Sequence, residues 1–210
     1  MIHFLDEINN RDLIISIDEK QNNIKLWDIR NFECFLIIKN IYANENILAC
    51  FLKENNSNYI IKSKTNITAD KESIKVYDFN GKKRKILNYS TEMTFYIESY
   101  FDKTIIKNYI ITYNKGHIIS YDFKENKKYH KYNDSNNKEV HNYSIIDSIG
   151  KIIKLIESCY EGNIRIWNFH SGELLNKIRI KPKKIIFSIC LYNCTFLFIG
   201  CEVNNIKIFF

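Results

Sequence analysis

A short phrase of alternating residues recurs along the chain and has an aromatic residue at its fourth position, usually followed by Asp or Asn. The copies are IKLWDI at 24–29, IKVYDF at 74–79, IISYDF at 118–123, IRIWNF at 164–169 and a shortened IKIFF at 206–210. Their aromatic residues, Trp27, Tyr77, Tyr121, Trp167 and Phe209, are separated by 50, 44, 46 and 42 residues. Self-similarity at this period indicates a repeat architecture in which each copy is one supersecondary unit.

Each repeat holds enough apolar runs for four short strands. The phrase itself alternates with the two-residue period of a β-strand. A polar, turn-prone stretch precedes each copy, and a further apolar run precedes that stretch, so the two runs predict a hairpin. These preceding runs cover 13–17, 59–61, 109–113, 152–156 and 196–199. Further runs cover 34–38, 84–87 and 174–178 after the phrase, and 47–51, 93–97, 143–146 and 185–189 before the next hairpin. Four antiparallel strands per repeat predict a propeller blade.

With this pattern, the chain resembles a divergent member of the WD-repeat family of β-propellers. The best single match is YEGNIRIWN at 160–168, continued by FHSGELL at 169–175, and Trp27-Asp28 is the only intact Trp-Asp pair. The resemblance implies an all-β propeller with about four full blades and a partial fifth, at 1–40, 41–90, 91–133, 140–181 and 182–210. The positions that carry the motif are Trp27, Asp28, Tyr77, Asp78, Tyr121, Asp122, Trp167, Asn168 and Phe209.

The chain departs from the family in its buried polar residues. The family places a Gly-His pair before the first strand of each blade, whereas Gly116-His117 stands before a predicted third strand. The resemblance associates that His with a Ser or Thr, an Asp and the Trp in a hydrogen-bond network. Without the His, we expect blade geometry to depend mainly on apolar packing. The Asp residues that end the phrase are expected to cap the following turn.

The last copy of the phrase leaves the fifth repeat short of a fourth strand. Propellers contain about four to eight blades. Three arrangements therefore remain: a fragment or incomplete ring, which is the preferred interpretation, a small closed ring, or an arc that another chain completes. Because an open strand edge promotes association, we expect the chain to self-associate when it is expressed alone.

The sequence offers no pattern typical of catalysis or cofactor binding. The histidines, His3, His117, His130, His141 and His170, are scattered without zinc-site spacing. No phosphate-binding Gly loop and no nucleophile elbow occurs. The six cysteines lie at 34, 50, 159, 190, 194 and 201, mostly in predicted strands, and are expected to be reduced structural thiols. We therefore expect no enzyme activity, no metal, no cofactor and no small-molecule substrate.

Two segments bear on where the protein is located in the cell. Residues 185–201 carry no charge, but they fall short of the roughly 18–20 residues of a membrane span and are interrupted at Tyr192-Asn193. They are predicted to form two strands rather than a membrane helix. Residues 1–7 lack the basic flank and long apolar region of a secretory signal. An intracellular protein of the cytoplasm or nucleus is expected.

The net charge of +7 supports an alternative function. Basic clusters occur at 82–85, 127–128 and 181–184, with Tyr89, Tyr129 and Tyr132 near two of them. Such clusters could contact RNA phosphates and bases, as in a component of a ribonucleoprotein or ribosome-biogenesis complex. Lysine in turns also keeps strand proteins soluble. Asn-rich segments at 54–58 and 133–137 are predicted to be solvated loops. The preferred function is a non-catalytic scaffold for protein partners in a larger complex.

Overall fold

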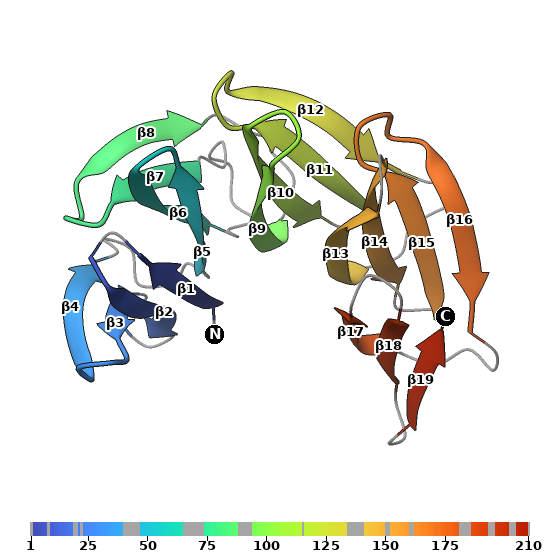
Figure 1. The fold of residues 1–210 in the computed structure, drawn as a ribbon, viewed down its shortest axis with the longest axis horizontal. Helices are drawn as coiled ribbons and strands as arrows, with labels where there is room; N and C mark the ends of the chain where they lie inside the picture. The colour runs from blue at the N-terminus through green and yellow to red at the C-terminus, as the bar shows by residue number, and fades with distance from the viewer. Residues whose placement is uncertain are drawn as a thin grey trace. The chain divides into compact units, whose positions relative to one another are not determined.

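The computed structural model describes residues 2–7, 9–18, 21, 23–39, 47–64, 74–87, 94–114, 116–133, 141–149, 152–159, 162–180, 186–192, 196–201 and 205–209. The described residues form β-strands and the turns between them, so the prediction of an all-β chain is confirmed. Their strands form successive antiparallel sheets in chain order (Figure 1). Repeated sheets of this kind fit a β-propeller-like fold.

Four sheets have four strands each, and the strands of each sheet pair in sequence order. The first contains β1 (Ile2–Asp6), β2 (Arg11–Asp18), β3 (Asn23–Asp28) and β4 (Glu33–Ile38). The second contains β5 (Ile47–Glu54), β6 (Ser57–Lys64), β7 (Ile74–Asp78) and β8 (Lys83–Leu87). The third contains β9 (Thr94–Asp102), β10 (Lys107–Asn114), β11 (His117–Asp122) and β12 (Lys127–Tyr132). The fourth contains β13 (His141–Ile149), β14 (Ile152–Cys159), β15 (Asn163–Asn168) and β16 (Leu174–Arg179).

A fifth sheet has three described strands, β17 (Ile186–Tyr192), β18 (Phe196–Cys201) and β19 (Asn205–Phe209). The uncharged segment at 185–201 thus forms strands over its described residues. The described part of the chain contains no helix with the length and apolar character that a membrane crossing requires.

The chain divides into two compact units, Met1–Thr112 with Ser120–Lys128 and Tyr113–Ile119 with Tyr129–Phe210. In the first unit, apolar residues of the first two sheets pack into one core. Phe4, Phe51 and Phe79 meet there with ring centroids 4.9 to 6.0 Å apart. In the second unit, Ile156 and Ile164 of the fourth sheet pack against Ile186 and Ile199 of the fifth. Within each unit, apolar residues on the facing sides of consecutive sheets therefore stabilise the packing of those sheets.

Two features of the fold differ from the sequence-based predictions. The Asn-rich segment at 54–58 is not a loop, because β5 and β6 continue up to a two-residue turn in which Asn55 has φ of 53°. Asn tolerates that conformation, so the segment closes a tight hairpin. The prediction made for the second Asn-rich segment falls almost wholly outside the described residues. The third sheet also contains β12, which the sequence does not predict because KKYHKY has no apolar run.

Candidate functional site

The aromatic residues of the repeated phrase lie on strands that occupy the same place in their sheets. Trp27, Tyr77, Tyr121, Trp167 and Phe209 lie on β3, β7, β11, β15 and β19, the third strand of each sheet. Tyr121 and Trp167 are buried, and Trp27 and Tyr77 are partly buried. The side chains of Trp27, Tyr77, Tyr121 and Trp167 thus serve packing, so these four residues do not form a binding surface.

The Asp or Asn that follows each aromatic residue holds the turn to the fourth strand. A side-chain oxygen of Asp28 accepts from the Arg30 N–H at 3.1 Å, and that of Asp122 accepts from Glu125 at 2.9 Å. Asp78 accepts from the N–H groups of Asn80 and Lys82 at 3.0 and 2.8 Å. Asn168 accepts from His170 and Ser171 at 3.0 and 3.2 Å. These residues have a structural role.

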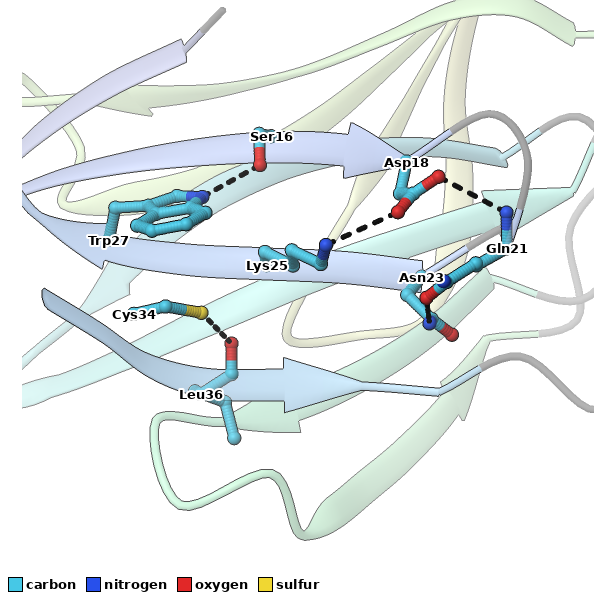
Figure 2. A network of polar contacts seen from close by, with 8 residues as sticks. All are labelled: Ser16, Asp18, Gln21, Asn23, Lys25, Trp27, Cys34 and Leu36. Carbon is cyan, nitrogen blue, oxygen red and sulfur yellow. Dashed lines mark hydrogen bonds and ion pairs between the residues drawn. The ribbon is translucent and has the colours of Figure 1, made fainter.

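A polar network on the first sheet supplements the apolar packing. The indole Nε1 of Trp27 donates to Ser16 Oγ at 2.8 Å, and Lys25 Nζ binds Asp18 Oδ2 at 3.2 Å (Figure 2). Both contacts join neighbouring strands on one face of the sheet. Ser16 is therefore part of the structural support of Trp27, although no sequence signal had singled it out.

A cavity of about 790 Å³, named here the Phe101 pocket, lies in the first unit beside the first strands of the first, second and third sheets. Phe4 of β1, Phe51 of β5 and Phe101 of β9 line it, and Ile106 lines it from the turn before β10. Strands β5 and β9 contact each other along one side. A cavity of this size accommodates a small ligand or several side chains of a protein partner.

Exposed apolar side chains surround the Phe101 pocket. Phe101 is 45% exposed and Ile106 is 76% exposed, and Tyr96 is similarly accessible. Ile106 also has φ of 53°, a conformation that disfavours β-branched residues. The corresponding position of the first sheet, immediately before β2, is Asn10 with φ of 51°. A large apolar residue thus occupies a turn position where the polar Asn fits more easily, which points to a use for its exposed side chain.

Three basic or imidazole side chains that line the Phe101 pocket are paired with carboxylates outside its lining. Lys53 Nζ binds Glu7 at 3.2 Å, and Lys107 Nζ binds Asp122 at 3.0 Å. His3 Nε2 is hydrogen-bonded to Asp12. These pairs place a polar border around the exposed apolar residues, which is the composition typical of protein interfaces.

Cys50 is the cysteine that lines the Phe101 pocket, and its surroundings disfavour reactivity of the thiol. Burial, followed by the charge of Glu98, raises the pKa of the Cys50 thiol far above its ordinary value. A reactive cysteine requires the opposite shift, because the thiolate is the attacking species. Cys34 and Cys50 are free thiols, and the described residues bring together no group of three His, Cys, Asp or Glu side chains suited to a metal ion.

The basic clusters are partly engaged in contacts within the protein. In the 82–85 cluster, Arg84 binds Asp78 at 2.6 Å, and Lys85 donates to the carbonyl of Phe123 at 2.8 Å. Tyr132 had been a candidate for base stacking, and this interpretation is wrong because the side chain is buried and its hydroxyl donates to the Phe169 carbonyl at 2.6 Å. Tyr89 and residues 181–184 lie outside the described residues.

Comparison with known proteins supports the fold. The chain resembles the crystal structure of the computationally designed protein Ika8, with a TM-score of 0.66 and 12% sequence identity. The similarity covers 94% of this chain and 55% of Ika8, so the chain spans about half of that protein's length. No family model and no curated protein matches the sequence. At this identity the likeness concerns the arrangement of the sheets alone.

Proposed function

We propose that the chain is a WD-repeat-like propeller or propeller segment that serves as a non-catalytic scaffold and binds protein partners at the Phe101 pocket. The observation that carries the proposal is the exposed group of Tyr96, Phe101 and Ile106 beside a cavity with a paired, charged border. Aromatic and aliphatic anchors within a polar rim contribute most of the binding energy in protein interfaces. The sheets fix the pocket, and its exposed side chains come from β9, which carries Tyr96 and Phe101, and from the turn before β10, which carries Ile106.

The proposal can be tested with Ile106→Asn. Asn tolerates φ of 53°, so this substitution removes the apolar side chain without straining the turn. The matched control is Phe32→Asn, which also replaces an exposed apolar residue at positive φ, in a turn that does not line the pocket. Tagged wild-type and variant chains would be used to capture proteins from cells that naturally express this chain, with quantitative mass spectrometry as the readout.

We expect a defined set of proteins to bind the wild type and Phe32→Asn, and to be reduced at least about tenfold with Ile106→Asn, as for loss of an interface anchor. Equal capture by all three chains would contradict the proposed site. Each capture would be repeated after ribonuclease treatment. If the captured set disappears with the RNA, the chain acts through nucleic acid, and the RNA-associated alternative replaces the protein scaffold.

A further inference from the structure

A second cavity of about 660 Å³ lies in the first unit, where turns of the first two sheets meet. Its lining comes from the turn before β2, the β5–β6 hairpin and the turn between β7 and β8. Arg11, Asn58, Asp78 and Arg84 are among its residues, and this set defines the Arg11 pocket. Unlike the Phe101 pocket, it is lined mainly by amides and guanidinium groups.

The acidic group in the Arg11 pocket is already satisfied. Asp78 Oδ2 accepts from Arg84 Nε at 2.7 Å, and Oδ1 accepts from the N–H groups of Asn80 and Lys82. Burial alone would raise the pKa of Asp78, but these hydrogen bonds and the charge of Arg84 hold it below its ordinary value. Asp78 is therefore ionised and neutralised by Arg84, which leaves the second guanidinium, Arg11, as the unmatched charge of the pocket.

Arg11 is held in place by an aromatic ring rather than by an acid. Its guanidinium carbon lies 4.8 Å from the ring centroid of Phe35. Toward the described residues, Arg11 makes no hydrogen bond and no ion pair through its side chain. A guanidinium stacked on a ring keeps its N–H donors at its edge, in the planar arrangement that matches a carboxylate or a phosphate.

The amide of Asn58, which lines the pocket, is fixed by a buried carboxylate of the first sheet. Asn58 Nδ2 donates to the buried Asp6 at 2.9 Å, and Asn9 Nδ2 donates to the same carboxylate at 2.8 Å. The amide orientation of Asn58 is fixed by this bond. Its Oδ1 is buried and has no partner within the described part of the chain. Because this oxygen is buried, a segment bound in the pocket does not reach it, and Asn58 shapes the pocket rather than contacting a ligand.

We propose that the Arg11 pocket binds an acidic side chain of a protein segment, with the anionic oxygens on the guanidinium of Arg11. The anion is a carboxylate or a phosphorylated side chain, since both fit the guanidinium. The net charge of +7 draws acidic partners toward the chain. This site is independent of Ile106 and of the partner proposed for the Phe101 pocket.

In the test, the full chain is titrated into labelled peptides of sequence Gly-Ser-X-Ser-Gly, where X is Glu, phosphoserine or Gln. The fluorescence anisotropy of the peptide reports binding. We expect saturable binding of the Glu or the phosphoserine peptide and none of the Gln peptide. Arg11→Gln should weaken binding at least about tenfold, as for loss of a charge-assisted contact. Lys103→Gln, which removes the same charge on an exposed turn outside the pocket, should bind as the wild type does.

Equal binding by wild type and Arg11→Gln would overturn the proposal, as would an equal loss in Lys103→Gln, which would indicate general charge attraction. Phe35→Leu provides a second variant, because it keeps Arg11 and removes the ring that positions it, and it should also weaken binding. Circular dichroism would establish that each variant is folded. A labelled oligoadenylate RNA is the last probe, and Arg11-dependent binding of this RNA, with no peptide bound, would overturn the assignment to a protein segment.

Discussion

The indole nitrogen of Trp27 donates to Ser16 Oγ at 2.8 Å, whereas the corresponding nitrogen of the buried Trp167 has no acceptor among the described residues. The strand registers explain the difference. Ser16 lies opposite Lys25, and Lys25 is two residues before Trp27. In the fourth sheet the matching residue is Glu157, which lies opposite Arg165, two residues before Trp167. Glu157 binds Arg165 at 2.6 Å instead of the tryptophan. Equivalent positions of the repeat thus carry different polar contacts.

Removing the Ser16 hydroxyl should reduce stability. We expect Ser16→Ala to lower the free energy of unfolding by about 1 kcal/mol, the net value of one hydrogen bond. The control is Ser158→Ala, because Ser158 is buried and its hydroxyl has no partner within the described residues. That substitution should leave stability unchanged or raise it. Urea unfolding followed by tryptophan fluorescence measures both, since Trp27 and Trp167 lie in the units that carry the respective serines. Equal losses would contradict the assignment.

Breaking the Glu157–Arg165 pair from one side should cost far more than replacing both residues. Both side chains are fully buried, so a single substitution leaves a charge without its counter-ion. We expect Glu157→Leu or Arg165→Met alone to destabilise by about 3–5 kcal/mol, and the double variant to be nearly neutral. A double-mutant cycle in denaturant measures the coupling. Additive effects in that cycle would show that the pair is not the stabilising contact.

Trp167 and the residue after it should differ strongly in their effect on stability. Trp167 is buried, and Trp167→Ala should cost about 3–5 kcal/mol because it leaves a large cavity. Asn168 holds a turn through side-chain hydrogen bonds, so Asn168→Ala should cost about 1 kcal/mol. Chemical denaturation should rank the two substitutions in this order. The reverse order would mean that the turn, rather than the packed ring, holds the fourth sheet.

The sequence predicted the elements whose residues combine several local signals. The phrase strands β3, β7, β11 and β15 join a two-residue alternation to an Asp or Asn that caps the next turn. The strand β12 is not predicted because three of the six residues in its sequence KKYHKY are lysines and its single buried residue is Tyr132. Charged residues suit a strand with one exposed face, but they give no apolar run.

The pockets could not be predicted from the sequence, because their residues are brought together only by the packing of successive sheets. Phe4, Phe51 and Phe101 line one pocket although they are far apart along the chain. The burial of Glu157 and Arg165 was equally invisible, since charged residues in an alternating strand usually face solvent. The exposed Ile106 had a weak signal, namely its place in a turn where Asn or Gly is common.

A second exposed apolar residue, Phe32, should reduce stability through its backbone conformation. It has φ of 57° and is 87% exposed, in the turn between β3 and β4. The comparable turns place Gly81, Asn126 and Gly172 at positive φ. Because Asn adopts this conformation more easily, Phe32→Asn should raise the free energy of unfolding by about 0.5–1 kcal/mol. Asn126→Phe should have the opposite effect, and thermal unfolding measures both. A loss of stability in Phe32→Asn would show that the ring makes a stabilising contact.

Asp122 should make the stability of the first unit depend on pH in the acid range. Burial by itself would raise the pKa of this carboxyl, but the N–H of Glu125 at 2.9 Å and Lys107 Nζ at 3.0 Å lower it below its ordinary value. A carboxyl whose pKa is lower in the folded than in the unfolded state stabilises the folded chain. This stabilisation is complete at pH values above the unfolded pKa of about 4. That stabilisation is lost as the pH falls through the lower, folded value.

We therefore expect wild type to be more stable than Asp122→Asn at neutral pH, and the difference to shrink as the pH falls below about 4. Urea unfolding of both chains from pH 7 down to pH 2 measures the difference, with Trp27 as the probe because it lies in the same unit. Lys103→Gln serves as the control, since this exposed residue has no contact with Asp122 and should show no such trend. A stability difference that stays constant over this range would mean that Asp122 is not ionised more readily in the folded chain than in the unfolded one.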